Sequence, residues 1–387
     1  MVVGVTFLSG KVAGGVVPQK VVATDVQKFT VYHSPQTPGY TCWVGCWLMP
    51  DNTLMVSFHQ ITGPLSGRPR ARKDILKRLG WPPAHHPEYG PNYAGYDMTG
   101  TIQEIIHLAS TDGGQTWKHI SSEPFHTPMN GLTCEAETAL SDGTIIRGVF
   151  GTWLVHYEVP KRGYFQRSKD GGLTWGHPET LIDPEKMTTT IGRLRVLKDG
   201  RLVATGYSDL SPKDRVMGAM GVKPAICISP DGGYTWSEPI TTLVPGAGIK
   251  PTHEFDFAEL PDGRLLFVYR AAKPPHGRWQ SLLEPDGQTY RVVSSGPAPF
   301  PHSGYPQMLA VREAVALHMA TTGIHWTSDA GETWNDLGIG GTGYYPQAVQ
   351  LSDGRIFCVY HRGGDDPYDG SVDQEIQAMT FRLKVGS

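Results

Sequence analysis

Short apolar runs broken by tight polar turns follow one another along almost the whole chain. Five segments share one plan, in which an apolar strand leads through an Asp-Gly-type turn into a second apolar strand: 48–58, 139–150, 196–207, 259–270 and 350–361. This arrangement predicts a β-hairpin. A sixth copy, at 306–320, keeps both apolar runs but has lost its Asp-Gly. The pattern therefore predicts six hairpins in series.

A second motif alternates with these hairpins. The octapeptide STDGGQTW at 110–117 has counterparts at 168–175, 229–236 and 327–334, and an eroded copy lies at 283–291. Its Asp can accept backbone N–H groups across its own turn, its glycine permits a positive φ, and its Trp can pack between sheets. We interpret the motif as a structural staple that joins two strands, rather than as a catalytic element.

The two motifs together define six units, each with an inner hairpin followed by an outer, stapled one. Four-stranded units spaced roughly 45–60 residues apart are typical of propeller blades. With 47 glycines, 31 prolines and only 18% charged residues, the composition also favours a loop-rich all-β protein. We therefore predict a single domain over residues 1–387, an all-β, six-bladed β-propeller with four-stranded antiparallel blades.

Charge and cysteine content exclude several classes of protein. A formal net charge of -3 without a basic tail gives no indication of a nucleic-acid partner. No apolar run approaches the roughly 18 residues of a membrane span, and no basic segment precedes an apolar core at the start. We expect a protein without membrane segment or signal peptide, cytoplasmic or exported with its signal removed. Five cysteines do not make a disulfide framework. No metal or other cofactor is expected, and the oligomeric state stays open.

The hairpin repeat also predicts which residues meet at the centre. The innermost strand of each blade runs along the propeller axis, so equivalent positions line one mouth. Eight residues before the turn Asp stand Trp43, Cys134, Ile191, Glu254 and Tyr345, and eight residues after it stand His59, Phe150, Tyr207, Arg270 and His361. Most of these positions hold apolar residues. On one blade they hold Glu254 and Arg270 instead, and on another they hold Tyr345 and His361. We expect these four side chains to be neighbours across the mouth.

The staples on six such units resemble the Asp-boxes of the sialidase superfamily, whose members are six-bladed β-propellers. The resemblance extends over residues 41–381. It implies an exo-glycoside hydrolase that acts on the terminal sugar of a glycan. Sialidases carry an inner-strand Glu with an Arg sixteen residues later, as Glu254 and Arg270 stand here, and a Tyr eight residues before the last Asp-Gly, as Tyr345 stands here.

The resemblance assigns roles to these residues. It implies that Tyr345 is the nucleophile, that Glu254 is its base, and that Asp97, ahead of the first staple, is the acid/base group. The chemical reason is that the anomeric carbon of a sialic acid bears a carboxylate, which would repel a charged nucleophile. A neutral phenol, with an ordinary pKa of about 10, then needs a neighbouring base.

The chain departs from the family in its arginines. Sialidases bind the substrate carboxylate with three arginines, because planar guanidinium groups match carboxylates. Cys42 stands where the first would align and His318 where the third would, so only Arg270 remains. Other arginines could substitute, namely Arg193, Arg195, Arg362 or those of the basic cluster SGRPRARK at 66–73. We therefore expect a terminal acidic or otherwise polar sugar, bound by Arg270, His59, His361, Arg193 and Glu137.

Two further classes of function are compatible with the sequence. Another carbohydrate-active chemistry could use the same fold. Glu135, Glu137 and Asp256 could form a carboxylate cluster, which would favour a carboxylate-pair glycosidase, whereas Tyr345 with His59 or His361 would suit an eliminating polysaccharide lyase. The remaining class is a non-catalytic glycan-binding or scaffold propeller.

Residues 60–100 interrupt the first blade between its two hairpins and are expected at the propeller mouth. Within them the apolar spacing of ARKDILKRLGW predicts a helix over 70–80. Loops on a rigid scaffold commonly carry specificity. The aromatic residues of the insertion could stack on sugar rings, or the insertion could be a cap or an oligomer contact; these residues are Trp81, Tyr89, Tyr93 and Tyr96.

Overall fold

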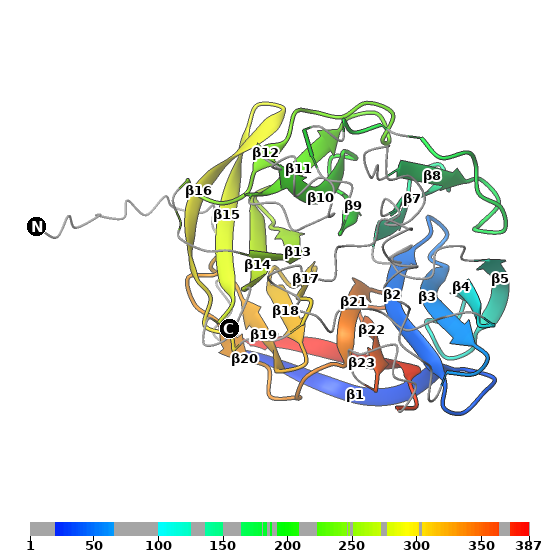
Figure 1. Cartoon of the computed structure of the whole chain (residues 1–387). Helices are drawn as coiled ribbons and strands as arrows, with labels where there is room; N and C mark the ends of the chain where they lie inside the picture. Colours follow the sequence, from blue (N-terminus) through cyan, green and yellow to red (C-terminus); the bar gives the residue numbers. More distant parts are fainter. Residues whose placement is uncertain are drawn as a thin grey trace, which may run out of the picture.

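Six antiparallel sheets are arranged in a ring around a central axis (Figure 1). The computed structural model describes residues 20–65, 100–124, 136–149, 164–179, 181–183, 186–187, 192–208, 223–245, 247, 251–271, 277–301, 304–363 and 372–386. The prediction of an all-β six-bladed propeller is confirmed. In this part of the chain five sheets have four strands and one has three. The helix expected at 70–80 lies outside the described residues.

Each strand pairs with the next within its blade. The first blade consists of β2 (Tyr40–Leu48), β3 (Leu54–Thr62), β4 (Ile102–Ser110) and β5 (Lys118–Pro124), and the second of β6 (Glu137–Ala139), β7 (Ile145–Val149) and β8 (Tyr164–Ser168). The third has β9 (Leu194–Val196), β10 (Leu202–Ser208), β11 (Lys223–Ser229) and β12 (Ile240–Thr241). The fourth has β13 (Pro251–Glu259), β14 (Leu265–Ala271), β15 (Trp279–Asp286) and β16 (Thr289–Pro297). The fifth has β17 (Gln307–Ala310), β18 (Ala316–Ala320), β19 (Gly323–Thr327) and β20 (Asn335–Asp336).

The sixth blade closes the ring with strands from both ends of the described chain. Its strands are β21 (Tyr344–Gln350), β22 (Ile356–Arg362), β23 (Glu375–Gly386) and β1 (Lys20–His33). β1 pairs antiparallel with β23 along its length. Because β1 precedes the first repeat, the hairpin pattern did not predict it. The pairing joins the start of the described chain to the last blade, as its outermost strand, and so closes the ring.

The staples are turns held by their own Asp and packed against the neighbouring blade. In the first, Asp112 Oδ1 accepts the backbone N–H of Thr116 at 2.9 Å and the hydroxyl of Ser110 at 2.7 Å. The ring of Trp117 lies 5.8 Å from that of Phe357 in the sixth blade. These contacts agree with a structural role for the staple.

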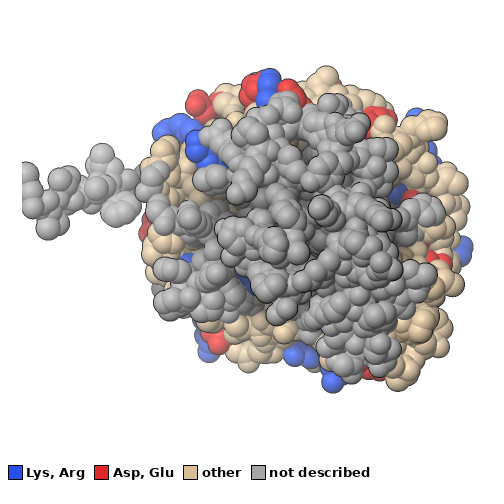
Figure 2. All heavy atoms as spheres, viewed as in Figure 1, with Lys and Arg blue, Asp and Glu red and all other residues tan. Residues whose placement is uncertain are grey.

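The inner strands surround a central cavity of about 370 Å³, lined by residues of β2, β6, β9, β13, β17 and β21. Apolar side chains pack between the blades around it, for example Phe255, Phe257 and Tyr269 of the fourth blade against Tyr207 of the third. Figure 2 shows that the described Lys, Arg, Asp and Glu side chains lie scattered around the rim of the viewed face, with both signs mixed. No helix in the described part of the chain is long and apolar enough to cross a membrane.

Candidate functional site

Three inner strands are irregular at the same end of the ring, the end away from the turns of the inner hairpins, which we call the mouth. The strand pairing shifts register within 42–45 of β2, 251–255 of β13 and 344–347 of β21. Trp43 and Tyr345 stand in two of these bulges with φ values of 50° and 52°. Bulky residues rarely adopt this left-handed region, so the surrounding structure must hold them there. A bulge re-aims a side chain, and here it does so at equivalent positions of adjacent blades.

Tyr345, Glu254 and Arg270 form one hydrogen-bonded cluster. Tyr345 Oη donates to Glu254 Oε1 over 3.0 Å, and Arg270 Nη1 donates to Glu254 Oε2 over 2.6 Å. The Glu254 residue is 2% exposed, whereas the Arg270 side chain is 24% exposed. One carboxylate therefore holds the phenol with one oxygen and the guanidinium with the other. In this geometry Glu254 can take the proton of Tyr345 directly.

His361 supports the ring of Tyr345 from the neighbouring strand β22. The two rings are stacked, with centroids 5.5 Å apart and planes 19° from parallel. Nδ1 of His361 accepts the backbone N–H of Trp43 at 3.3 Å, which requires that Nδ1 carries no proton. Since His361 is buried, its contacts suit a role in positioning Tyr345 and Trp43.

His59 stacks on Trp43 in the same way as His361 stacks on Tyr345. The rings of Trp43 and His59 are stacked 5.6 Å apart, and Trp43 meets Tyr345 edge-on at 6.5 Å. Burial lowers the pKa of His59 to about 3, so this imidazole is neutral at physiological pH. The two aromatic–histidine pairs together form one wall of the mouth.

The first and third arginine positions of the sialidase pattern hold buried side chains of other types. Cys42 is buried, and its thiol donates a hydrogen bond to Tyr40 Oη at 3.3 Å. His318 is fully buried and stacks on Phe300, with ring centroids 4.0 Å apart. Burial, Arg278 and His325 hold the pKa of His318 well below its ordinary value. Neither position therefore supplies a cation to the mouth.

Arg193 lies beneath the mouth and is almost fully buried. Its guanidinium carbon is 4.0 Å from the ring centroid of Tyr305, and Nη2 donates to the carbonyl of Pro306 at 3.0 Å. The neighbouring Arg195 binds Asp256 through two hydrogen bonds, of 3.1 and 2.7 Å. Asp256 is completely buried and engaged with these structural partners.

Glu137 lies in the wall of the central cavity and is 6% exposed. Its Oε2 accepts the hydroxyl of Ser57 at 2.5 Å, and its Oε1 lies 3.3 Å from His107 Nε2. Burial raises the pKa of this carboxyl, but His107, Arg147 and Ser57 outweigh burial and the net shift is downward. Glu137 is therefore an ionised member of a network between the first two blades.

Several predicted residues fall outside the described part of the chain. These are the proposed acid/base Asp97, Glu135 as a possible partner of Glu137, and the aromatic residues of the 60–100 insertion. Within the described residues no group of three His, Cys, Asp or Glu side chains could hold a metal ion.

Sequence reasoning missed two residues beside the cluster, Arg278 and Tyr305. Arg278 is 1% exposed and donates through Nη2 to the carbonyl of Gly304 at 2.6 Å. Burial lowers its pKa to about 9, and the charges of Glu254 and Arg270 act on it in opposite directions. The ring of Tyr305 lies 5.7 Å from that of Tyr345. Arg278 and Tyr305 precede β15 and β17, outside the hairpin positions that the repeat aligns, so no signal in the repeat marks them.

Comparison with known proteins identifies the repeat and the fold. A family model, the BNR/Asp-box repeat, matches residues 108–119, which contain the whole of the first staple. No curated protein matches the chain. A protein of unknown function from Dyadobacter fermentans is similar in structure, with a TM-score of 0.62, 18% identity and coverage of 93% of this chain and 99% of that one.

Two enzyme structures with bound small molecules are also similar. The GH93 α-L-arabinofuranosidase of Fusarium graminearum, in complex with arabinobiose, has a TM-score of 0.55 and 15% identity, covering 92% of this chain and 98% of that one. The intramolecular trans-sialidase from Ruminococcus gnavus, in complex with oseltamivir carboxylate, has a TM-score of 0.58 and 10% identity, covering 91% and 96%. At these identities the likeness is one of fold.

Proposed function

We propose that this chain is an exo-acting glycoside hydrolase. The premise is that it is a BNR/Asp-box six-bladed β-propeller with structural similarity to sialidases and GH93 arabinanases. The observation that carries the proposal is the 3.0 Å hydrogen bond from Tyr345 to Glu254, whose other oxygen binds Arg270. A weak nucleophile becomes effective when a base lies within hydrogen-bond reach, and this pair meets that condition at the mouth of the propeller.

The proposed reaction has two displacements. Glu254 takes the phenolic proton while Tyr345 Oη bonds to the anomeric carbon, the glycosidic C–O bond breaks, and Asp97 gives a proton to the leaving oxygen. Water then attacks the same carbon and gives a proton to Asp97, the bond to Tyr345 breaks, and the phenol regains its proton from Glu254. The role of Asp97 rests on the sequence. Two displacements at one carbon predict retention of configuration.

The proposed substrate is a terminal sugar with an acidic or otherwise polar substituent. A neutral nucleophile is advantageous where a carboxylate nucleophile would be repelled by an anionic sugar. Arg270 is partly exposed at the mouth and can reach such a substituent. Because Cys42 and His318 add no further cation, sialic acid is one candidate among several.

The alternative chemistries have less support in the geometry. Asp256 and Glu137, which a carboxylate-pair glycosidase would use, are both buried and engaged with structural partners. The histidines that a lyase would use are buried as well, His59 against Trp43 and His361 against Tyr345.

Kinetics on a panel of aryl glycosides test the proposal. The panel should include a sialoside, uronides and an L-arabinofuranoside. On the best substrate, Tyr345→Phe should lower kcat at least about a thousandfold while ligand affinity stays near normal, because only the hydroxyl is lost. Tyr344→Phe is the matched control, since Tyr344 stacks on His361 at 5.7 Å and is given no chemical role. Full activity of Tyr345→Phe would contradict the proposal, and a panel with neither turnover nor binding would favour a scaffold.

A further inference from the structure

The turn of the inner hairpin carries an ion pair in three of the six blades. There the turn Asp is followed two residues later by an Arg, and the Arg Nε donates to the Asp Oδ2 over 2.7 Å. The pairs are Arg201–Asp199, Arg264–Asp262 and Arg355–Asp353. Each of these turns therefore neutralises its own carboxylate with a guanidinium.

Two of these arginines also reach the next blade. Arg201 Nη1 donates to the carbonyl of Gln288, in the turn between β15 and β16, at 2.8 Å. Arg355, on the sixth blade, lies against Gly113 in the staple of the first blade. At both junctions a guanidinium fills the space between a hairpin and the next blade.

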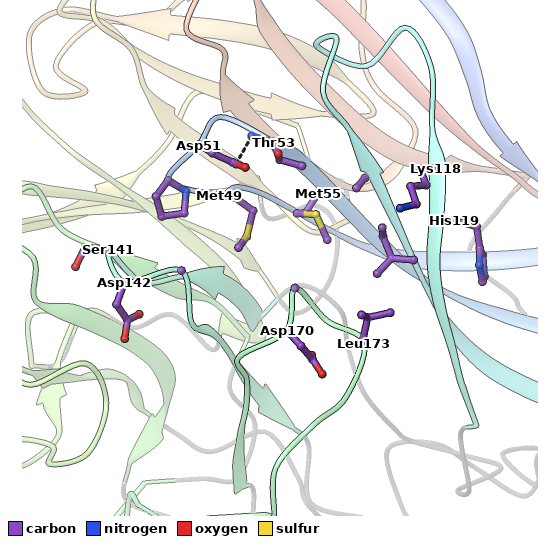
Figure 3. Close-up of a pocket in the computed structure, with 15 residues that line it drawn as sticks. Met49, Asp51, Thr53, Met55, Lys118, His119, Ser141, Asp142, Asp170 and Leu173 are labelled. Atoms are coloured by element: carbon purple, nitrogen blue, oxygen red, sulfur yellow. Dashed lines mark hydrogen bonds between the residues drawn. The ribbon is translucent and has the colours of Figure 1, made fainter.

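The first and second blades carry threonine in place of this arginine. Thr53 follows Asp51, and Thr144 follows Asp142. Between these two blades, where an arginine at position 53 would lie, the structure has a groove of about 670 Å³ (Figure 3). Gly171, in the staple of the second blade, borders it, and no described atom beyond its chain neighbours lies within 4 Å of where its Cβ would stand.

The groove has an apolar floor and an acidic rim. Met49, Met55, Ile120 and Leu173 line it, and Figure 3 shows Met49 and Met55 pointing into the space between the hairpin of the first blade and the turns of the second.

Three carboxylates face two basic side chains around this rim. Hydrogen bonds within their own turns lower the pKa of Asp51, Asp142 and Asp170, so all three are ionised at neutral pH. Lys118 and His119 stand on the opposite wall. The rim is therefore negatively charged on balance and complementary to a cation.

We propose that this groove binds an arginine side chain of a partner protein, presented next to an apolar residue on an extended segment. The guanidinium of the partner's arginine lies against Gly171, in the same way as Arg355 lies against Gly113 at the junction of the sixth and first blades. There it is within reach of the carboxylates of Asp51 and Asp142. The apolar neighbour packs on Met49 and Met55. Arginine is expected over lysine because planar guanidinium groups occupy such junctions within the chain, and Arg201 there binds a carboxylate and a carbonyl together.

The groove lies at the opposite end of the inner strands from the Tyr345 cluster. β2 carries Trp43 near its first residues, at the mouth, and ends at Leu48, and the groove begins at Met49. A bound partner would therefore leave the mouth open, and groove variants should not change glycoside turnover.

Binding of two synthetic peptides tests the proposal. The first is fluorescein-labelled Ser-Leu-Arg-Leu-Ser with blocked ends, and the second replaces arginine with citrulline, which is neutral and of the same shape. Fluorescence polarisation should show saturable binding of the arginine peptide to the full chain. The citrulline peptide should bind at least about tenfold more weakly, because it lacks the charge that assists the hydrogen bonds to the carboxylates.

Substitution in the groove supplies the second part of the test. Thr53→Arg should close the groove from within, weaken the arginine peptide at least about tenfold, and raise Tm by about 1–2 °C. Val293→Arg, on the outer strand β16 of the fourth blade, is the control for an added arginine, because this residue is 40% exposed and lies outside the groove. It should bind the peptide as the parent does. Equal affinity for the two peptides, undiminished binding by Thr53→Arg, or no saturable binding to the parent would each overturn the proposal.

Discussion

Tyr345 and Trp43 stand at matching bulges of adjacent blades, each with a positive φ and each backed by a stacked histidine. A glycine would take this backbone conformation at lower cost but would place no ring at the mouth. The N–H of Trp43 binds His361, and His361 stacks on Tyr345, so the two bulges are linked. The position of the phenol therefore depends on two blades at once.

At the same scale, His59 should make stability depend on pH. Its folded pKa is about 3, below the ordinary 6.5, so the unfolded chain binds a proton that the folded protein does not. The free energy of unfolding therefore does not depend on this group above about pH 6.5. Between there and the folded pKa it falls on acidification, by at most about 1.4 kcal/mol per pH unit. Urea unfolding between pH 7 and 4 should show a shallower pH dependence for His59→Gln, because the buried imidazole is gone.

The exposed His177 supplies the control for this measurement. His177→Gln should reproduce the parent curve of unfolding free energy against pH. A parent-like slope for His59→Gln would mean that another group is responsible for the acid sensitivity.

At the scale of the element, hairpins and staples could be predicted because each carries its own turn chemistry. The Asp-Gly turns and the Ser–Asp–Thr bonds of the staples are local and leave a mark in the sequence. The closing strand β1 has no such mark, since its partner β23 lies at the other end of the chain. The second blade also lacks a fourth strand among the described residues, where an isolated bridge joins Phe165 to Glu179. Pairings of this kind depend on the tertiary fold.

Asp170→Ala tests the structural role of a staple. Asp170 accepts the N–H of Thr174 at 2.9 Å and the hydroxyl groups of Ser168 and Thr174 at 2.8 and 2.5 Å. Losing these bonds should lower the free energy of unfolding by about 1–2 kcal/mol and leave turnover per folded molecule unchanged. Because its folded pKa is about 2, below the ordinary 3.8, this contribution is present above about pH 4 and is lost as the pH falls through 2. Denaturant unfolding at several pH values measures the difference.

Lys169→Ala, next to the staple Asp on the exposed side of the turn, is the control and should leave stability near that of the parent. If Asp170→Ala instead lost turnover with an unchanged Tm, the staple would belong to the catalytic site.

At the scale of the whole molecule, the ring brings Tyr345 to 3.0 Å from Glu254 although 91 residues separate them. Counting from the turn Asp anticipated this contact, because the inner hairpins repeat around one axis. The same count could not find Arg278 or Tyr305, which approach from the connections between strands. Nor could it show that Arg193 is buried with structural partners, because burial is decided by neighbouring blades.

Covalent trapping tests most directly whether Tyr345 is the nucleophile. The probe is a glycoside of the sugar that the panel identifies, with fluorine on the carbon next to the anomeric carbon and a good leaving group. Fluorine slows both displacements by disfavouring positive charge at the anomeric carbon, while the leaving group keeps the first step fast, so the glycosyl-enzyme accumulates. Mass spectrometry of proteolytic peptides should find the sugar on Tyr345 in the parent and in Tyr344→Phe, and no label in Tyr345→Phe. A label on Glu254 or on another carboxylate would contradict the proposed nucleophile.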